Sequence, residues 1–519
     1  MADNEPPSEA GFVEYGIEEK PPLGESALLG LQHYLTMVGA NIAVPLILAG
    51  AMGMPADATA RLVGTFFVVS GIATLAQTTF GNRYPIVQGA PFSMLAPALA
   101  IIGVVGSFPG NPGWEVMIVH LQGAIIVAAL AEVAIGYFGV VGKLRQFLSP
   151  VVVAPTIALI GLSLFSVPQV TSATQNWWLL GLTLFLIVLF SQYLKESNKV
   201  FKLFPVLLAI VVAYVVAAVL SVTGVYAPGT PGYVDFSTVT SAPALLPIYP
   251  LQFGMPVIET SFIVGMFAGV VASIVESFGD YHAVARLSGV GAPSEKRINH
   301  GIGMEGLMNV FAGIMGAGGS TSYSENIGAI GLTGVASRYV VQVGAAIMLL
   351  IGFIGYFGQL IATIPSPIIG GLFIAMFGQI VAVGLSNLKY VDLDSSRNIF
   401  VLGTAMFAGL AIPAYMNNVA AVDPNIAGPE MLRMGLEGVP LLGVVLGTKL
   451  VADTLFVIGG TGMAVGGLVA VVLDNTIPGS DDERGLTVWQ AIAEDDEDFQ
   501  TFFERRSNDG ASGSPESAD

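Results

Sequence analysis

The sequence predicts an all-α, multi-pass membrane protein, and two observations, composition and the length of the apolar runs, support this fold class. Hydrophobic residues make up 54% of the 519 residues and charged residues only 11%, whereas soluble proteins carry about 25%. Separate apolar runs of roughly 17 to 25 residues recur along the chain, which is the length of a membrane-spanning helix rather than of a barrel strand. The chain contains no cysteine, so disulfides, thiolate metal sites and cysteine nucleophiles are excluded.

About 14 apolar segments follow one another along the chain. They lie near residues 27–50, 62–80, 86–105, 115–138, 148–167, 177–194, 203–222, 257–278, 302–316, 325–335, 339–357, 368–387, 398–414 and 458–473. A further apolar stretch, 437–457, is expected to be re-entrant or interfacial. The predicted organisation is an acidic N-terminal tail (1–25), a first repeat (26–222), an extracellular loop (223–256), a second repeat (257–478) and an acidic C-terminal tail (479–519).

Lysine and arginine predict the orientation of these segments. Most of them follow even-numbered segments, and none occurs in the loops 106–114, 168–176, 223–256 and 358–367. Because cytoplasmic loops are enriched in lysine and arginine, both termini are predicted to be cytoplasmic. The net charge of −18 is concentrated in the two tails, which is typical of solvated tails and of proteins from high-salt organisms. We expect no nucleic-acid partner.

The third segment of each half is short and begins irregularly. The first half has Tyr84-Pro-Ile-Val-Gln-Gly-Ala-Pro-Phe-Ser93, and the second has a small, polar lead-in (316–324) before about 10 apolar residues. Such a segment cannot span the bilayer, and non-helical backbone at membrane depth must be buried in protein or line a cavity. Seven segments per half place the second half upside down. The sequence therefore predicts a 7+7 inverted repeat, with half-helices 3 and 10 meeting at a substrate site.

Two carboxylates on the eighth segment are candidates for binding substrate or a proton. Glu276 and Asp280 are four residues apart, so both project from one face of a helix. A carboxylate at membrane depth normally faces the bundle interior and marks a substrate or proton path. We therefore assign coupling to Glu276. The alternative interpretation is that this helix ends early and leaves Asp280 among the cytoplasmic headgroups.

Polar and aromatic residues at the half-helices complete the candidate site. Glu325 and Asn326 lie where the tenth segment becomes helical, near Ser324, and they either cap its free N–H groups or contact a ligand. A flat heterocyclic amide, with alternating donors and acceptors, would match that edge. Phe92 and Tyr323 would stack on its faces or simply pack in the protein.

The remaining chemistry of the chain predicts neither an enzyme nor a metal site. His33 on the first segment is expected to make structural hydrogen bonds rather than to coordinate a metal. The four histidines do not have the spacing of metal ligands, and the chain has no nucleotide-binding loop and no hydrolase triad. We expect no cofactor other than a coupling ion, H⁺ or Na⁺.

Several motifs resemble the nucleobase–ascorbate transporter family, also called nucleobase:cation symporter-2, which includes uracil and xanthine permeases. Glu325-Asn-Ile-Gly-Ala-Ile-Gly-Leu-Thr-Gly334 matches the family signature, in which Gln, Glu or Pro precedes Asn and a Gly and a Thr follow. The other blocks that resemble the family are Gln32-His33, Gln88 to Phe92, Val275 to Tyr281, Ser396 to Asn398 and Leu473 to Gly479. One departure is Pro91, which replaces the usual Ser before Phe92.

The resemblance implies a core of segments 1–4 and 8–11 and a gate of segments 5–7 and 12–14 that commonly also dimerises. The function implied is import of a nucleobase of the uracil or xanthine/uric acid type by proton symport, by a homodimer in the lipid bilayer of the cell membrane. The ascorbate branch usually has Pro at position 325, so we favour a base. The implied roles are base-edge binding by Glu276 and Glu325, stacking by Phe92, backbone contact near Tyr323 and Ser324, and support of binding and coupling by Asp280, Asn326 and His33.

Three alternatives remain open on the residues alone. Sodium could replace the proton as coupling ion. An anion transporter of the sulfate or bicarbonate type shares the expected fold, but it should carry basic or neutral groups where this chain has Glu276 and Glu325. An intramembrane enzyme would need a paired catalytic constellation, which the sequence does not offer.

Overall fold

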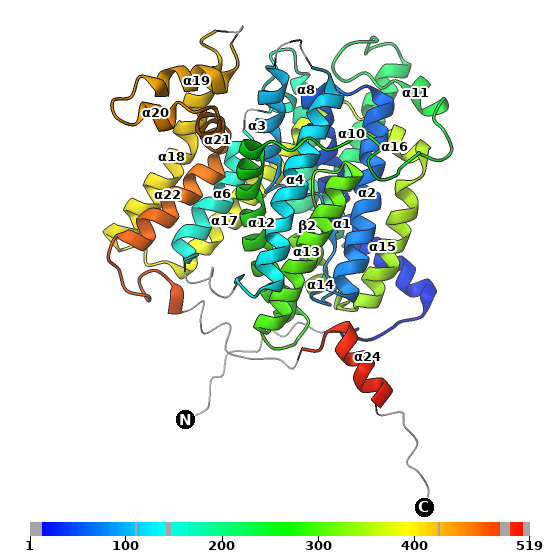
Figure 1. The fold of residues 1–519 in the computed structure, drawn as a ribbon. Coiled ribbons are helices and arrows are strands. Elements are labelled where there is room, and N and C mark those ends of the chain that lie inside the picture. Colours follow the sequence, from blue (N-terminus) through cyan, green and yellow to red (C-terminus); the bar gives the residue numbers. More distant parts are fainter. Residues whose placement is uncertain are drawn as a thin grey trace, which may run out of the picture.

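The computed structural model of the protein describes residues 13–108, 110, 112–141, 147–165, 167–423, 426–487 and 499–511. Much of both predicted acidic tails, namely residues 1–12, 488–498 and 512–519, lies outside these ranges. The described chain is almost wholly helical, and most of its long helices run side by side (Figure 1).

Each of the 14 predicted apolar segments contains a helix. In chain order these are α1 (Leu23–Met52), α2 (Ala56–Thr79), α3 (Leu95–Gly106), α4 (Trp114–Tyr137), α6 (Pro150–Ser163), α8 (Trp177–Val188) continued by the π-helical turn η1 (Leu189–Tyr193), α10 (Pro205–Val222), α12 (Thr260–Leu287), α13 (Glu295–Met315), α14 (Ser324–Thr333), α15 (Arg338–Gly352), α17 (Ser366–Ser386), α18 (Ser396–Ala420) and α22 (Gly462–Thr476).

Short elements connect these helices. They are the strands β1 (Gln88–Gly89) and β2 (Thr321–Ser322), the 3₁₀ turn η2 (Asn387–Tyr390), and the helices α7 (Pro168–Thr171), α9 (Lys199–Leu203), α11 (Phe236–Thr240), α16 (Gly355–Ala362), α19 (Gly428–Glu437), α20 (Gly443–Leu446), α21 (Lys449–Gly459) and α24 (Phe502–Ala511). Among the described residues, seven helices are long and apolar enough to cross a membrane alone. The α21–α22 pair, bent by 96°, would make an eighth span. The protein is therefore a multi-pass membrane protein.

Local sequence signals set several helix ends. The side chains of Ser294, Ser337 and Ser395 cap α13, α15 and α18 by accepting a backbone N–H three residues on. Helices α1 and α14 end at Gly53 and Gly334 in the left-handed conformation, which glycine adopts without steric cost. The elements thus begin and end where the residue types favour it.

The helices pack into two bundles. In the first bundle, α4 packs on α12 and α13, while α15 packs on α1 and α2; it comprises α1–α4 and α12–α15. In the second bundle, α17 packs on α6 and α8, while α22 packs on α6 and α18; it comprises α6, α8, α10, α17, α18 and α22. In Figure 1, α18 and α22 lie at the left and α2 and α15 at the right.

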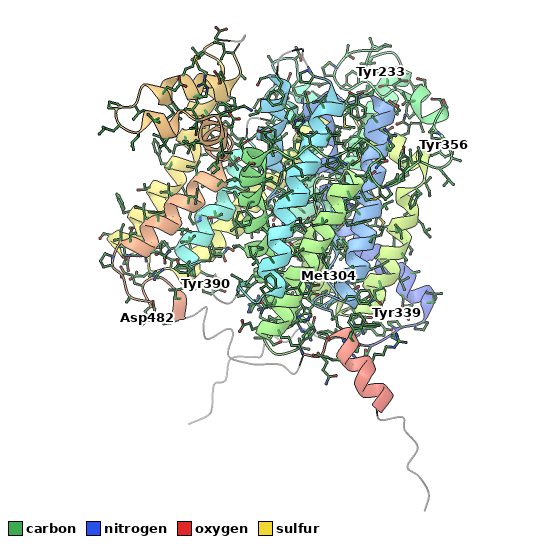
Figure 2. All side chains as sticks on the ribbon, in the orientation of Figure 1. Tyr233, Met304, Tyr339, Tyr356, Tyr390 and Asp482 are labelled. Atoms are coloured by element: carbon green, nitrogen blue, oxygen red, sulfur yellow. The ribbon has the colours of Figure 1, made fainter. Side chains whose placement is uncertain are left out.

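Tyrosines lie at both ends of the helices (Figure 2). Tyr233 and Tyr356 lie at one end of the helices. Tyr339 and Tyr390 lie at the opposite end, which is also the end where α24 lies. Tyrosine is enriched at the two membrane–water interfaces, so this distribution fits helices that cross a bilayer. We call the end near α24 the terminus side, because α1 also begins there.

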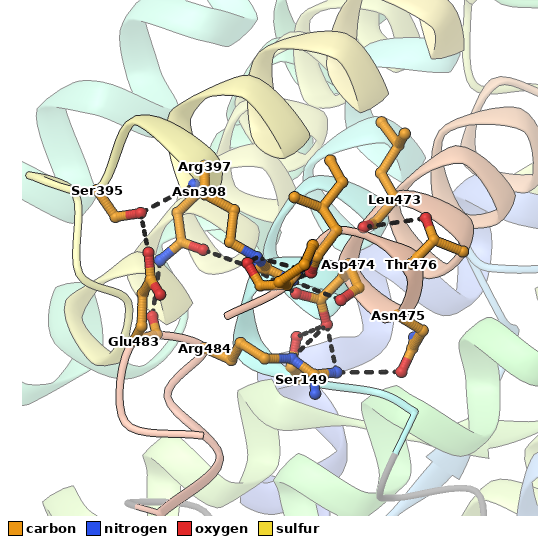
Figure 3. Close-up of polar contacts among 12 residues, drawn as sticks. Ser149, Ser395, Arg397, Asn398, Leu473, Asp474, Asn475, Thr476, Glu483 and Arg484 are labelled. Carbon is orange, nitrogen blue, oxygen red and sulfur yellow. Dashed lines mark hydrogen bonds and ion pairs between the residues drawn. The ribbon is translucent and has the colours of Figure 1, made fainter. Parts of the chain in front are cut away.

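On the terminus side of the second bundle, one buried carboxylate joins four segments (Figure 3). Asp474 of α22 lies 2.9 Å from Arg397 of α18 as an ion pair, and it accepts hydrogen bonds from Arg484 at 2.8 Å and from Ser149 at 2.8 Å. Arg397 also donates to the carbonyl of Ile477, just beyond the end of α22. The motifs around 396–398 and 473–479 therefore hold this end of the second bundle together.

Described residues of both tails contact the bundles: Glu18 and Arg505 meet at the first bundle, and Arg484 pairs with Asp474 of the second. Glu18 pairs with Arg83 at 3.1 Å, with Arg338 at 2.6 Å and with Arg505 at 3.0 Å. The Glu14 N–H donates to the carbonyl of Gly334 at 2.8 Å. The expectation of fully solvated tails is wrong for these residues, because the arginines at the helix ends bind the acidic tail.

Acidification is expected to loosen this tail contact. Partial burial alone would raise the pKa of Glu18, but the hydrogen bond from Arg338 and the charges of Arg338, Arg83 and Arg505 hold the pKa below its usual value. The ion pairs therefore stabilise docking at neutral pH, and that stability is lost as the pH falls below about 4. Because Glu18 is 45% exposed, each pair contributes only about 0.2–1 kcal/mol.

The measurement is amide hydrogen exchange of Glu14 at neutral and acidic pH, corrected for intrinsic exchange. We expect the Glu14 amide of the native protein to be less protected at acidic pH than at neutral pH. Glu18→Gln should show this lower protection at both pH values. The matched control Glu14→Gln changes an exposed carboxylate and should keep the pH dependence of the native protein. Equal protection of the native protein at both pH values would contradict the prediction.

Candidate functional site

The irregular lead-ins of the third and tenth segments meet as a two-stranded antiparallel sheet. Gln88 of β1 lies opposite Ser322 of β2, and Gly89 lies opposite Thr321. The half-helices α3 and α14 follow these strands. Helix α14 begins at Ser324, where the sequence predicts its start. The sheet therefore places the N-terminal end of α14, with its free N–H groups, beside the lead-in of α3.

Asn326 connects the two lead-ins. Its side chain is fully buried, its Nδ2 donates to the carbonyl of Pro85 at 2.9 Å, and its Oδ1 accepts from the N–H of Val87 at 2.9 Å. The hydroxyl of Tyr323 adds a bond to the carbonyl of Ala90 at 2.7 Å. The side chains of Asn326 and Tyr323 are thus engaged with the backbone of the other lead-in.

Asp280 lies inside the first bundle, next to the start of α14. Its carboxylate accepts hydrogen bonds from the hydroxyls of Ser322 and Ser324, each at 2.6 Å, and the residue is 5% exposed. Helix α12 continues to Leu287, nine residues past the predicted end of the apolar segment. The alternative interpretation, in which the helix ends early and leaves Asp280 among headgroups, is wrong because hydrogen bonds within the bundle compensate its carboxylate.

Glu276 and Glu325 are the carboxylates of the site that the protein leaves free. Both are half-buried, and in the described part of the chain no other side chain donates a hydrogen bond to either carboxylate. Glu276, Asp280 and Glu325 lie close enough to interact electrostatically. Their acceptor oxygens are therefore available to a ligand.

An opening lies between α12 and α14 beside these carboxylates. Gly279 and Gly328 each follow a site glutamate by three residues, on the same helical face. A Cβ atom added to either glycine would meet no atom within 4 Å. At the opposite end of α12, a Cβ on Gly265 would lie 2.1 Å from Val457 of α21. Space for further atoms is thus present beside both glutamates, whereas α12 packs tightly against α21 near its start.

The other predicted site residues lie around this group. Phe92, in the lead-in to α3, is 6% exposed, and its ring packs edge-on against Phe377 of α17 with centroids 6.0 Å apart. Phe92 therefore lies where the two bundles meet. His33 of α1 is 2% exposed and lies beside the backbone of Val335, just past α14. Neither ring nitrogen has a hydrogen-bond partner in the described part of the chain, so the structural hydrogen bonds predicted for His33 are not formed there.

One residue that borders the site, Glu305, is not among the residues predicted from the sequence. Glu305 of α13 is 1% exposed and accepts hydrogen bonds from Ser273 and Ser277 of α12 and from Thr321 of β2, at 2.6 to 3.0 Å. The rule that marks intramembrane carboxylates as functional applies equally to this residue. Its position inside the predicted ninth segment was the signal that could have identified it.

A polar site between two broken helices, inside a bundle of membrane-spanning helices, defines a membrane transporter. Residues 24–417 match the xanthine/uracil permease model, described as a permease family, and the chain belongs to this family. This confirms the predicted resemblance. The family is one of transporters and not of enzymes, as the sequence predicts.

Curated relatives agree with this assignment. Solute carrier family 23 member 2 of Homo sapiens is 41% identical, covering 92% of this chain and 76% of the relative. Nucleobase-ascorbate transporter 12 of Arabidopsis thaliana is 34% identical, covering 92% and 72%.

Two solved structures share the fold. The transmembrane domain of the cyanobacterial bicarbonate transporter BicA gives a TM-score of 0.53 at 16% identity, covering 79% of this chain and 100% of that domain. The murine Solute Carrier 26 family member A9 anion transporter gives 0.52 at 13%, covering 75% and 66%. These likenesses support the all-α multi-pass fold only.

Proposed function

We propose that the protein imports a nucleobase of the uracil, xanthine or uric acid type by symport with a proton. The observation that carries this proposal is the pair of free carboxylates, Glu276 and Glu325, beside one opening at the start of α14. The edge of a nucleobase offers N–H donors to the carboxylates and C=O acceptors to the free N–H groups of a helix N-terminus.

The remaining site residues orient this edge. Phe92 would stack on the face of the base once its contact with Phe377 is released. The backbone at Tyr323 and Ser324 would contribute donors and acceptors. Asp280 would support binding by fixing Ser324, and Asn326 and His33 would support the position of α14.

A proton on Glu276 would link transport to the proton gradient. Its neighbours Asp280 and Glu325 repel a third charge, and carrying unpaired charge through the membrane is costly. Protonation removes that charge before the base crosses. We propose that the first bundle is the moving core, with α1–α4 from the repeat 26–222 and α12–α15 from the repeat 257–478, and that the second bundle is the gate and the homodimer contact. The protein would lie in the cell membrane with both termini cytoplasmic.

The test is uptake of radiolabelled uracil, xanthine and ascorbate into proteoliposomes, with proton and sodium gradients imposed separately. We expect uracil or xanthine to accumulate under the proton gradient. Accumulation only under the sodium gradient would make sodium the coupling ion. Ascorbate is included because the name of the Arabidopsis relative includes it, and uptake of ascorbate alone would overturn the choice of substrate.

A second candidate function is anion transport, which is favoured by the likeness in fold to a bicarbonate transporter. Two carboxylates at the opening would repel an anion, so we rank this function lower. Movement of bicarbonate or sulfate in the same proteoliposomes, without uptake of any base, would establish it and overturn the proposal of base transport.

Replacing Glu276 with glutamine is expected to remove accumulation against a gradient. The amide of glutamine keeps a C=O acceptor for the base but cannot take up or release a proton, so the base should equilibrate across the membrane without being concentrated. Glu196→Gln makes the same chemical change at an exposed position and should behave as the native protein. A Glu276→Gln protein that still accumulated the base would contradict the coupling role.

A further inference from the structure

A second pair of buried carboxylates lies between α4 and α13. Glu132 of α4 is fully buried, Glu305 of α13 is 1% exposed, and the two interact electrostatically. Helices α4 and α13 pack closely, and α4 is one of the helices that cross the membrane alone. The pair is thus removed from water at both residues.

The two carboxylates differ in how their oxygens are used. Both oxygens of Glu305 accept hydrogen bonds from hydroxyl groups. In Glu132, Oε2 accepts from Nδ2 of Asn309 at 2.8 Å, whereas Oε1 is buried and has no hydrogen-bond partner among the described residues. Asn309 cannot rotate to serve that oxygen, because its Oδ1 accepts from the N–H of Ser320 at 2.6 Å.

An ionised carboxylate whose oxygen lacks a hydrogen-bond partner is unfavourable beside another buried carboxylate. Burying a charge costs several kcal/mol unless a partner compensates it, and no lysine or arginine in the described chain pairs with Glu132 or Glu305. The titratable groups that α12 presents to the pair are Tyr281, Asp280 and Glu276. Helix α3 carries none, and no group of α1 interacts with Glu132. None of these neighbours supplies a positive charge.

A proton is the cation that fits this arrangement. It needs one free oxygen, and Oε1 of Glu132 is free. A metal ion needs several oxygens, and no group of three or more acidic or histidine side chains in the described chain has the geometry for one. Protonated Oε1 would carry no charge, so it would be far less costly to bury without a partner than an ionised oxygen.

The lead-in to α14 connects this pair with the candidate substrate site. Ser320 is bound through Asn309 to Glu132, Thr321 is bound to Glu305, and Ser322 is bound to Asp280. Glu325 follows three residues after Ser322. A ligand that shifts the start of α14 therefore also shifts the hydrogen-bond donors on both buried carboxylates.

We propose that the pair Glu132 and Glu305 forms a proton-binding site that holds one proton, on Oε1 of Glu132, and that proton exchange there is linked to ligand binding through residues 320–322. The link rests on the proposed function, whereas the bound proton does not. This site is separate from the coupling carboxylate Glu276.

The bound proton is tested without substrate, by infrared spectroscopy of the full-length protein in liposomes at neutral pH. A buried protonated carboxyl gives a C=O band that an ionised one lacks. We expect the band to be lost in Glu132→Gln and in Glu305→Gln and to be kept in Glu115→Gln, which changes an exposed carboxylate on the same helix. A band that is unchanged in Glu132→Gln overturns the site.

A second variant keeps the test decisive if Glu132→Gln fails to fold. Glu132→Asp retains the carboxyl group on a shorter side chain, so its C=O band should move relative to the native protein, and an unmoved band overturns the site.

The link is tested by calorimetry of uracil and xanthine binding in buffers of different ionisation enthalpy. We expect proton exchange on binding to be smaller in Glu132→Gln than in Glu115→Gln. Equal exchange overturns the link, whereas absence of any base binding overturns the proposed function and leaves the infrared result standing.

Discussion

Replacing Asn326 with leucine is expected to abolish binding of the base and to lower the free energy of unfolding by about 2 to 6 kcal/mol. The buried amide is the polar link from α14 to the carbonyl of Pro85 and the N–H of Val87. Without it, two buried backbone groups lose their partners, at about 1–3 kcal/mol each. The lead-in that carries Phe92 would then separate from α14, so the two halves of the site would no longer face each other.

Two variants separate this effect from a general loss of stability. Asn417→Leu makes the same change at an exposed position of α18 and should alter neither unfolding nor binding. Asn326→Asp keeps the acceptor for Val87 but loses the donor to Pro85, so it should fall between leucine and the native residue. Denaturant unfolding and the Kd of uracil or xanthine are the measurements. Native binding by Asn326→Leu would show that Asn326 does not position the site.

The membrane makes the helices of this chain predictable. A bilayer fixes the length of a spanning helix, so apolar runs alone locate α1 and α4 within a few residues at both ends. The same length rule identifies α14 as a half-helix, because about 10 apolar residues cannot cross. Local chemistry adds the start of α14, where the polar residues of its lead-in end.

Polar contacts between distant segments could not be predicted in this way. Asn309 and Glu132 are 177 residues apart, and nothing local to either shows that α13 lies against α4. The two interpretations of Asp280 could not be separated for a related reason. From the sequence alone, Asp280 could lie inside the bundle or among the headgroups. The hydrogen bonds that place it inside the bundle come from Ser322 and Ser324, more than 40 residues further on.

Substituting alanine for Asp474 is expected to destabilise the protein by about 3–5 kcal/mol without changing the Kd of the base. Asp474 is 1% exposed and compensates the charges of Arg397 and Arg484, whose side chains are 7% and 14% exposed. Removing the carboxylate takes the shared negative charge away from two largely buried guanidinium groups. Ser149 also loses its hydrogen-bond acceptor. The second bundle would lose the contact that ties α6 and α18 to the end of α22.

The matched control is Asp481→Ala, which removes another carboxylate near the same arginine. Asp481 is 62% exposed and lies 4.0 Å from Arg484, so its loss should cost less than about 1 kcal/mol. Asp474→Asn keeps an acceptor for Ser149 and should lie between the two. Unfolding in denaturant gives the stabilities, and equilibrium binding of uracil or xanthine gives the Kd. A large rise in Kd for Asp474→Ala, with stability unchanged, would mean that this cluster acts on the substrate site, because a contact confined to the second bundle can change only how firmly that bundle holds together.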